Sequence, residues 1–158
     1  MMTIQQEAST TPVPSSNYTK ILVGYDGSKN SERALLRSAT LAKELGASLT
    51  VLVAVNTTVL TFSPISPPVP AEVYQDVLNN GKETLGNAIK TAQSIVPGAS
   101  GIVEEGNAGE CIPNFAARSG IDLIVLGRRG MSGVERFLLG GVSSNVIAHS
   151  NCDVLIVK

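Results

Sequence analysis

The sequence predicts an α/β fold in which a doubly wound, five-stranded parallel sheet carries helices on both faces. The first observation is that five short strand-like runs, most of them continuously apolar, are spaced along the chain. Continuous apolar runs are typical of strands buried on both faces of a parallel sheet. The second observation is that the segments between these runs repeat apolar residues at helical spacing. Alternating strands and helices, joined by right-handed crossovers, limit the topology to a doubly wound sheet.

Composition indicates one folded domain. The chain has 158 residues, of which 43% are hydrophobic and 16% are charged, so it can bury a substantial core. Its formal net charge of -1 gives no electrostatic signature of binding to nucleic acid or anionic membrane. Cys111 and Cys152 match no disulfide framework or metal cluster and are expected to be reduced and largely buried. No apolar run approaches the roughly 18 residues of a membrane span, and no secretory signal is visible. We therefore expect a cytoplasmic protein with neither nucleic acid nor membrane as a partner.

The elements follow in order along the chain. Residues 1–18 are rich in Ser, Thr, Gln and Pro and are expected to form a disordered tail before a domain at 19–158. The strand-like runs lie at 20–25, 48–55, 100–105, 121–126 and 153–158. The helical segments lie at 29–45, at 71–96, after Asn107 and at 142–149, and a Pro-rich loop occupies 56–70.

Turn and cap residues define several helix ends. Ser28 suits the N-cap of the first helix, and Gly46 suits its C-terminal stop. Asn107–Glu110 resembles a capping box, but Pro113 sits badly in a helix interior, so the regular third helix could begin only at Pro113. Two glycines weaken the second helix, and the sequence allows a break near Asn79–Gly81.

Two loops of unusual composition follow the first and fourth strands. In a doubly wound sheet, ligands bind beyond the carboxyl ends of the strands, where the strand order reverses. If these two strands are neighbours there, Tyr25–Ser28 faces the segment that begins at Gly127. Asp26 could then accept hydrogen bonds from a sugar hydroxyl. An Asx-turn or helix-start role for Asp26 is favoured by composition alone.

The loop after the fourth strand contains Gly127, Gly130, Gly140 and Gly141, a spacing of G-x2-G-x9-G-G. It matches neither the dinucleotide fingerprint nor the Walker A loop. A glycine-rich loop between a buried strand and a helix start can turn its backbone N–H groups toward an anion. Our hypothesis is that this loop holds the phosphates of a nucleotide, although four glycines in a loop more often serve only to form turns.

The order of several motifs resembles one known family. From the first strand onward they are Ile-Leu-Val-Gly-Tyr-Asp-Gly-Ser, Gly-Asn-Ala-Gly-Glu, Asp-Leu-Ile-Val-Leu-Gly-Arg-Arg-Gly, Leu-Leu-Gly-Gly-Val-Ser-Ser-Asn-Val-Ile and Cys-Asp-Val-Leu-Ile-Val. Over about Lys20 to Lys158 the sequence resembles a single-domain universal stress protein. The resemblance implies a Rossmann-like sheet in the order 3-2-1-4-5, a homodimer, and a role in stress response or signalling.

The ATP-binding branch of this family has G-x2-G-x9-G followed by Ser or Thr. The sequence matches the three glycines and departs at position 141, where Gly replaces the hydroxyl residue. Losing one neutral hydrogen bond costs about 0.5–1.5 kcal/mol, or roughly tenfold in affinity at most. Binding is therefore expected to survive, with Ser143 as the main remaining hydroxyl.

The resemblance implies an adenine nucleotide ligand, ATP or else AMP or ADP, with Mg²⁺ as a candidate companion ion. The residues it assigns to the ligand are Gly24, Tyr25, Asp26, Ser28, Ala54, Leu126, Gly127, Arg129, Gly130, Gly140, Gly141, Val142 and Ser143. No catalytic residue or metal ligand is assigned, and slow hydrolysis of ATP is the most that is expected. Two alternatives stay open: a dimeric scaffold that binds no nucleotide, and a slow ATPase or nucleotide hydrolase.

The last strand has its own implication. In the order 3-2-1-4-5, Cys152 to Lys158 would form a sheet edge, and a long apolar edge needs covering. Pairing with a second copy across a two-fold axis would cover it, with Val154 and Ile156 on one face.

Overall fold

The computed structural model describes residues 17–57, 69–128 and 141–158 and contains the predicted five-stranded parallel sheet in the order β3-β2-β1-β4-β5. The strands are β1 (Lys20–Gly24), β2 (Ser48–Val55), β3 (Ser100–Glu105), β4 (Leu123–Gly127) and β5 (Asp153–Val157). The helices are α1 (Lys29–Leu45), α2 (Ala71–Ile95), α3 (Ala108–Ser119) and α4 (Gly141–His149). Most of the predicted tail, the Pro-rich loop and the glycine loop lies outside the described residues.

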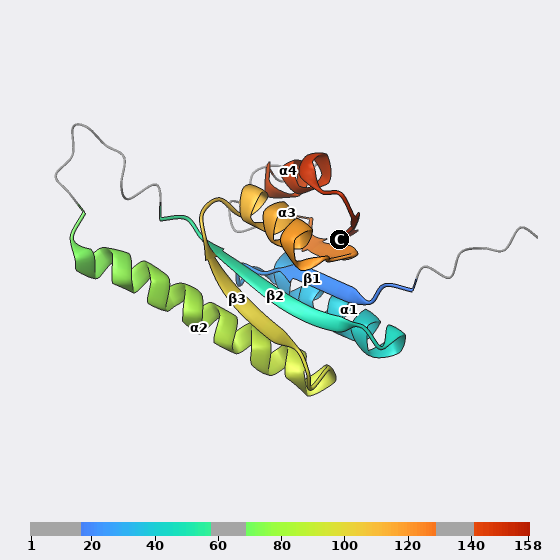
Figure 1. Cartoon of the computed structure of the whole chain (residues 1–158). Coiled ribbons are helices and arrows are strands. Elements are labelled where there is room, and N and C mark those ends of the chain that lie inside the picture. The colour runs from blue at the N-terminus through green and yellow to red at the C-terminus, as the bar shows by residue number, and fades with distance from the viewer. Residues whose placement is uncertain (1–16, 58–68, 129–140) are drawn as a thin grey trace, which may run out of the picture.

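Two helical layers cover the sheet, with α1 and α2 on one face and α3 and α4 on the other (Figure 1). Strand side chains alternate between the two faces. On β1, Ile21 and Val23 join the core beneath α1 and α2, whereas Leu22 joins the core beneath α3 and α4. All three are completely buried, which explains why the strand is apolar at consecutive positions.

The strand order reverses at β1. It pairs with β2 on one side, Lys20 opposite Ser48, and with β4 on the other side, Ile21 opposite Leu123. Because all three strands are parallel, their carboxyl ends meet at one edge of the sheet. The chain leaves β1 at Tyr25 and β4 at Arg128, so the two loops singled out from the sequence emerge beside one another.

The predicted helix ends of α1 are confirmed. The Ser28 hydroxyl oxygen accepts a hydrogen bond from the Ser31 N–H at 3.1 Å. At the other end, Gly46 adopts a left-handed conformation, with φ of 66°, and its N–H donates to the Ala42 carbonyl. A side chain is disfavoured at this φ, which accounts for glycine there.

Two expectations about helix breakers were wrong. Helix α3 begins at Ala108, because the Asn107 side chain accepts from the Gly109 N–H at 2.8 Å, and Pro113 lies buried inside the helix. Helix α2 runs without a break through Asn79–Gly81. A Cβ on Gly81 would lie 2.4 Å from Val55 Cγ2, so this glycine permits close contact between helix and sheet.

Asp122 connects the amino ends of β1 and β4 through hydrogen bonds. Its carboxylate accepts hydrogen bonds from the Thr19 N–H and hydroxyl, both at 2.8 Å, and from the Lys20 N–H at 3.1 Å. Partial burial acts to raise the pKa of Asp122, but these hydrogen bonds outweigh it and lower the pKa below its usual value. Because the Asp122 side chain forms these bonds just before the strand, regular pairing of β4 begins at Leu123, two residues later than the predicted strand.

Tyr18, which the sequence placed in the tail, donates its hydroxyl to Asp153 at 2.7 Å.

The sheet has β3 and β5 at its edges. Among the described helices, none is long and apolar enough to cross a membrane.

Both cysteines are free thiols that are only partly buried, contrary to the expectation of largely buried residues. Burial raises the pKa of each thiol.

Candidate functional site

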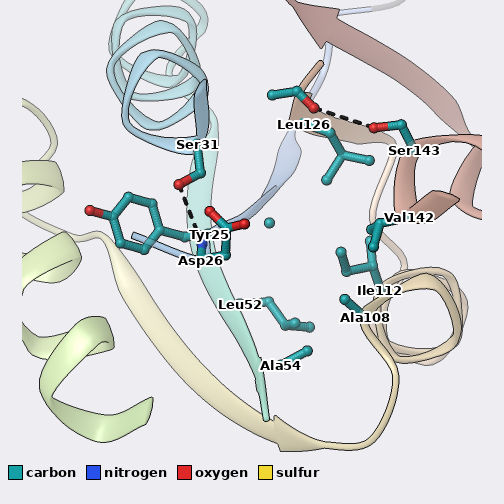
Figure 2. A pocket seen from close by; sticks show the side chains of 12 residues that line it. Tyr25, Asp26, Ser31, Leu52, Ala54, Ala108, Ile112, Leu126, Val142 and Ser143 are labelled. Carbon is teal, nitrogen blue, oxygen red and sulfur yellow. Dashed lines mark hydrogen bonds between the residues drawn. The ribbon is translucent and has the colours of Figure 1, made fainter. Parts of the chain in front are cut away.

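A cleft opens at the carboxyl end of the sheet, where β1 and β4 part, on the face that α3 and α4 cover (Figure 2). It is lined from six places in the sequence: the end of β1 with the following turn, the start of α1, the end of β2, the start of α3, the end of β4 and the start of α4. The lining residues are Gly24, Tyr25, Asp26, Ser31, Leu52, Ala54, Ala108, Ile112, Leu126, Gly127, Val142 and Ser143.

The first wall of the cleft, residues 25–31, is shaped by local hydrogen bonds. One carboxylate oxygen of Asp26 accepts from the Ser28 N–H at 2.9 Å, which is the Asx-turn expected for this residue. The Asp26 N–H donates to the Ser31 hydroxyl at 3.3 Å, and that hydroxyl donates to the Ser28 carbonyl at 3.0 Å. Gly27 between them has φ of 81°. The Asp26 carboxylate is thus held at the cleft in a fixed turn.

Tyr25 contributes to this wall mainly through its backbone. Its N–H donates to the Leu52 carbonyl, which continues the pairing of β1 with β2. Its ring points away from Val142 and Ile112 (Figure 2), and its hydroxyl donates to Glu32 at 2.8 Å. Burial, followed by this hydrogen bond to a carboxylate, raises the pKa of Tyr25 to about 12.

The second wall consists of Gly127 and residues 141–143. The Ser143 hydroxyl donates to the Gly127 carbonyl at 3.3 Å, and the Ser143 side chain is buried. A Cβ on Gly127 would lie 2.6 Å from the carbonyl carbon and oxygen of Asn30. Glycine is therefore required where β4 touches the first turn of α1. At Gly141, by contrast, an added Cβ would meet no atom within 4 Å.

The floor is apolar and is formed by Leu52 and Ala54 of β2, Ala108 and Ile112 of α3, and Leu126 of β4. Such a slot suits a flat, weakly polar ring. Three helices, α1, α3 and α4, begin at the cleft, and helix N-termini favour negative charge. Asp26 is the one carboxylate among the described lining residues. The arrangement can hold a ring on the floor, a hydroxyl at Asp26 and an anion near the helix starts.

Most of the described residues that were assigned to the ligand come together here. Ser28 and Gly141 belong to the wall segments 25–31 and 141–143 but do not themselves line the cavity, and Arg129, Gly130 and Gly140 lie outside the described residues. The lining residues that lie together are Gly24, Tyr25, Asp26, Ala54, Leu126, Gly127, Val142 and Ser143. Their cavity measures about 80 Å³, below the roughly 300–1,000 Å³ of common ligand pockets. The cavity among the described residues is therefore smaller than a common ligand pocket.

Four lining residues were not predicted, and three of them carried a usable signal. Leu52 lies two residues before Ala54 and so shares its face of β2. Ile112 lies one turn after Ala108, in the helix that follows β3. Ser31 lies three residues after the Ser28 cap, on the first turn of α1. Ala108 gave no signal beyond its place at a helix start.

Among the described residues, no group of three or more His, Cys, Asp or Glu side chains is placed to hold a metal ion.

Comparison with known proteins gives a consistent match. The model of the universal stress protein family matches residues 17–158. A universal stress protein of Bacillus subtilis (strain 168), YxiE, is 36% identical over 147 residues, which cover 89% of this chain and 99% of that protein.

Solved structures agree. The universal stress protein UspA from Lactobacillus plantarum superposes with a TM-score of 0.77 at 27% identity, covering 90% of this chain and 99% of that one. A universal stress protein in complex with cAMP superposes with a TM-score of 0.61 at 29% identity, covering 90% of this chain and 98% of that one.

Proposed function

Because this chain belongs to the universal stress protein family, we propose that its cleft between β1 and β4 binds an adenine nucleotide and that the bound ligand regulates a stress response in the cytoplasm. The observation that carries the proposal is the cleft itself, which combines an apolar floor, one fixed carboxylate and three helix starts at the switch point of the sheet. A solved relative in complex with cAMP supports the ligand class.

Each part of a nucleotide has a matching part of the cleft. Adenine fits the apolar floor near Leu52 and Ala54, and the ribose hydroxyls fit Asp26 as acceptor. The phosphates then lie toward Gly127 and the start of α4, where Ser143 supplies a hydroxyl. ATP is the finer proposal, with Gly130 and Gly140 as further phosphate contacts and Mg²⁺ carried by the nucleotide.

The ligand itself is tested first on the purified protein. Denaturing freshly purified protein and chromatographing the supernatant should release an adenine nucleotide. Calorimetric titration with ATP, ADP, AMP and cAMP then ranks the ligands. Absence of any released nucleotide, together with no heat and no thermal shift at millimolar ligand, would contradict the proposal.

The location is tested by a matched pair of glycine substitutions. A Cβ on Gly24 would lie 2.6 Å from Leu126 Cδ2 and 2.9 Å from Ile112 Cδ1, two side chains of the cleft floor. A Cβ on Gly101 would lie 2.7 Å from the side-chain ends of Leu85 and Ile89, away from the cleft. Gly24→Ala should therefore weaken nucleotide binding, whereas Gly101→Ala should cause a similar loss of stability and leave binding unchanged.

The role of Asp26 is tested by Asp26→Asn. The amide oxygen of Asn can still accept from the Ser28 N–H, so the turn is kept while the charge is lost. Nucleotide affinity should fall by roughly three- to tenfold if the carboxylate accepts from the ribose, since hydrogen bonds to charged groups exceed neutral ones. Turnover that disappears in Asp26→Ala while binding persists would instead favour a slow ATPase.

We further propose that the protein is a homodimer through the last strand, Cys152 to Lys158. Strand β5 is an edge strand, and its apolar side chains are only half-buried in one copy of the chain. These side chains are Val154, Leu155, Ile156 and Val157. A second copy would cover them. Val154→Asp should shift the protein to monomer in analytical ultracentrifugation, and an unchanged dimer would mean that another surface forms the interface.

A dimeric scaffold without nucleotide is the competing function. It is favoured by Gly141 in place of the hydroxyl residue and by the small volume of the described cavity. The two functions separate in the titration above, because a scaffold gives no heat with any of the four nucleotides while its sedimentation remains that of a dimer.

A further inference from the structure

A second groove lies on the opposite face of the sheet, between the outer side of α1 and the end of β5. It measures about 300 Å³ and is lined by Arg33, Leu36, Arg37, Thr40, Val157 and Lys158. Both arginines are exposed, and Leu36 is 42% exposed. The groove therefore offers cationic and apolar surface side by side, at a distance from the nucleotide cleft.

The basic side chains of this groove are Arg33, Arg37 and Lys158. None of its three basic side chains forms an ion pair with another described residue. Helix α1 carries four basic residues and two acidic ones. One of those acids, Glu32, already accepts the Tyr25 hydroxyl. An acidic partner would supply the missing counter-charges.

The groove runs beside an available strand edge. Within the described residues, β5 pairs with β4 alone, so its other edge presents backbone N–H and C=O groups. The two faces along this edge differ in chemistry. Leu155 and Val157 face the layer of α1, with its arginines, whereas Val154 and Ile156 face the apolar layer of α3 and α4. On α4, Ile147 is 47% exposed.

We propose that this edge binds an extended segment of a partner protein in which acidic and apolar residues alternate. The segment adds to β5 as a sixth strand. Its side chains point alternately to the two faces, so the acidic ones meet Arg33 and Arg37 and the apolar ones meet the side of Val154 and Ile156. The two arginines are one helical turn apart, about 6 Å along the helix. Alternate residues of a strand are about 6.6–6.8 Å apart, which matches that spacing.

This proposal is independent of nucleotide binding and has a consequence for assembly. The partner segment and the second copy of the chain would use the same edge of β5. Binding of the segment therefore converts the dimer to a monomer, and partner recognition and self-association exclude one another.

The test uses a fluorescent peptide of sequence Glu-Val-Glu-Val-Glu-Val and the full-length protein. Three control peptides are matched to it: one with Gln in place of Glu, one with the same residues in the order Glu-Glu-Glu-Val-Val-Val, and one methylated on alternate backbone nitrogens. Fluorescence anisotropy measures affinity, and analytical ultracentrifugation measures assembly. The alternating acidic peptide should bind, the three controls should bind more weakly, and the dimer should dissociate as the peptide binds.

The protein variants test the groove. Arg33→Gln and Arg37→Gln should each weaken the acidic peptide by about threefold, since exposed ion pairs are individually weak. Lys43→Gln is the matched control, because it removes one exposed charge from the same helix outside the groove. Thermal unfolding should be unchanged in all three. Affinity should fall as salt rises from about 0.05 to about 0.5 M.

Three results would overturn the proposal. One is no binding of the acidic peptide at about 1 mM, which corresponds to a binding free energy weaker than about −4 kcal/mol. Another is equal binding of the Gln and Glu peptides, or equal effects of Arg37→Gln and Lys43→Gln. A third is binding that leaves the dimer intact and tolerates backbone methylation, because the strand edge would then not be used.

Discussion

The two walls of the cleft between β1 and β4 are built in different ways. In the first wall, residues 25–31, the hydrogen bonds join residues two to five positions apart, and they hold the Asp26 turn to the start of α1. In the second wall, Gly127 and residues 141–143, one hydrogen bond joins Ser143 to Gly127 across sixteen positions. An added side-chain atom at Gly141 would touch nothing within 4 Å.

This difference distinguishes a wall whose conformation is set by local hydrogen bonds from a wall in which one position, Gly141, can accept another side chain. The first wall takes its shape from local sequence and is in place before any ligand arrives, which lowers the cost of binding. The second wall is joined by one hydrogen bond between distant segments, and at Gly141 it leaves room for a side chain. The departure of this chain from the ATP-binding motif falls on Gly141, where an added Cβ meets no atom within 4 Å, and not on Gly127, where it would meet backbone atoms.

The largest expected effect comes from Gly127→Ala, at the point where the two walls touch. The new Cβ would lie 2.6 Å from backbone atoms of Asn30, which cannot rotate away as a side chain can. We expect a loss of about 3 kcal/mol in the free energy of unfolding, at the upper end for an overpacked site. Urea denaturation measures it.

Gly86→Ala is the control for that loss. Gly86 lies within α2, and an added Cβ meets no atom within 4 Å. The same substitution should therefore stabilise the protein by about 0.5–1 kcal/mol. If the two variants unfold at the same urea concentration, the walls are not in rigid contact.

The same distinction between local and distant contacts explains what the sequence predicted. The strands, the α1 cap at Ser28 and the Asp26 turn depend on neighbouring residues, and all were predicted. The errors at Pro113 and Gly81 came from judging a residue alone. The Asn107 cap fixes the start of α3 before Pro113 is reached, and contact with Val55 explains a glycine within α2.

The cleft was predictable to the same extent. Its rim follows the carboxyl ends of two strands, so the sequence located Asp26 and Gly127. Its floor also includes Leu52 and Ile112, which reach it only through the register of β2 and the packing of α3. Strand and helix spacing could have added Leu52 beside Ala54 and Ile112 one turn after Ala108, but no local pattern in the sequence specifies that β2 and α3 meet at this floor.

The second prediction concerns the hydrogen bond from Tyr25, at the start of the first wall, to Glu32 and its dependence on pH. At neutral pH, Tyr25→Phe removes the hydrogen bond to Glu32 and should cost about 1.5 kcal/mol, as expected for a bond to a charged acceptor. The folded-state pKa of Tyr25 is raised from 10.0 to about 12, so folding favours the protonated hydroxyl. The stability from this group is fully present below pH 10.0 and is lost as the pH rises through about 12.

The measurement is the difference in unfolding free energy between the wild-type protein and Tyr25→Phe at a series of pH values. The difference removes the contributions of lysines and of the other tyrosines, which also titrate in this range. It should be constant up to about pH 10 and then shrink as the pH rises toward 12. A difference that stays constant throughout would show that the Tyr25 hydroxyl does not interact with Glu32.

The third prediction changes the second wall without disturbing the fold. Gly141→Ser supplies the hydroxyl of the ATP-binding motif in open space. Stability should change by less than about 0.5 kcal/mol, as for most surface sites. Nucleotide affinity should rise by up to about tenfold, the worth of one neutral hydrogen bond. Gly141→Ala is the control, and titration calorimetry should show no gain in affinity for it.

The smallest effect is expected from Ser143→Ala. Its hydrogen bond to the Gly127 carbonyl is long, at 3.3 Å, so its loss should cost about 0.5 kcal/mol of stability, the low end for a hydrogen bond. Ser144→Ala, an exposed neighbour outside the lining, is the control and should cost less.

The same variant shows whether the Ser143 hydroxyl serves the wall or the ligand. If it stays on the Gly127 carbonyl, Ser143→Ala leaves nucleotide affinity almost unchanged. If it turns to a phosphate, affinity falls by about threefold, and the fall becomes smaller once Gly141→Ser supplies a second hydroxyl. The double-mutant cycle between positions 141 and 143 measures this coupling, because two hydroxyls on one phosphate are not additive. A cycle with no coupling assigns Ser143 to the wall alone.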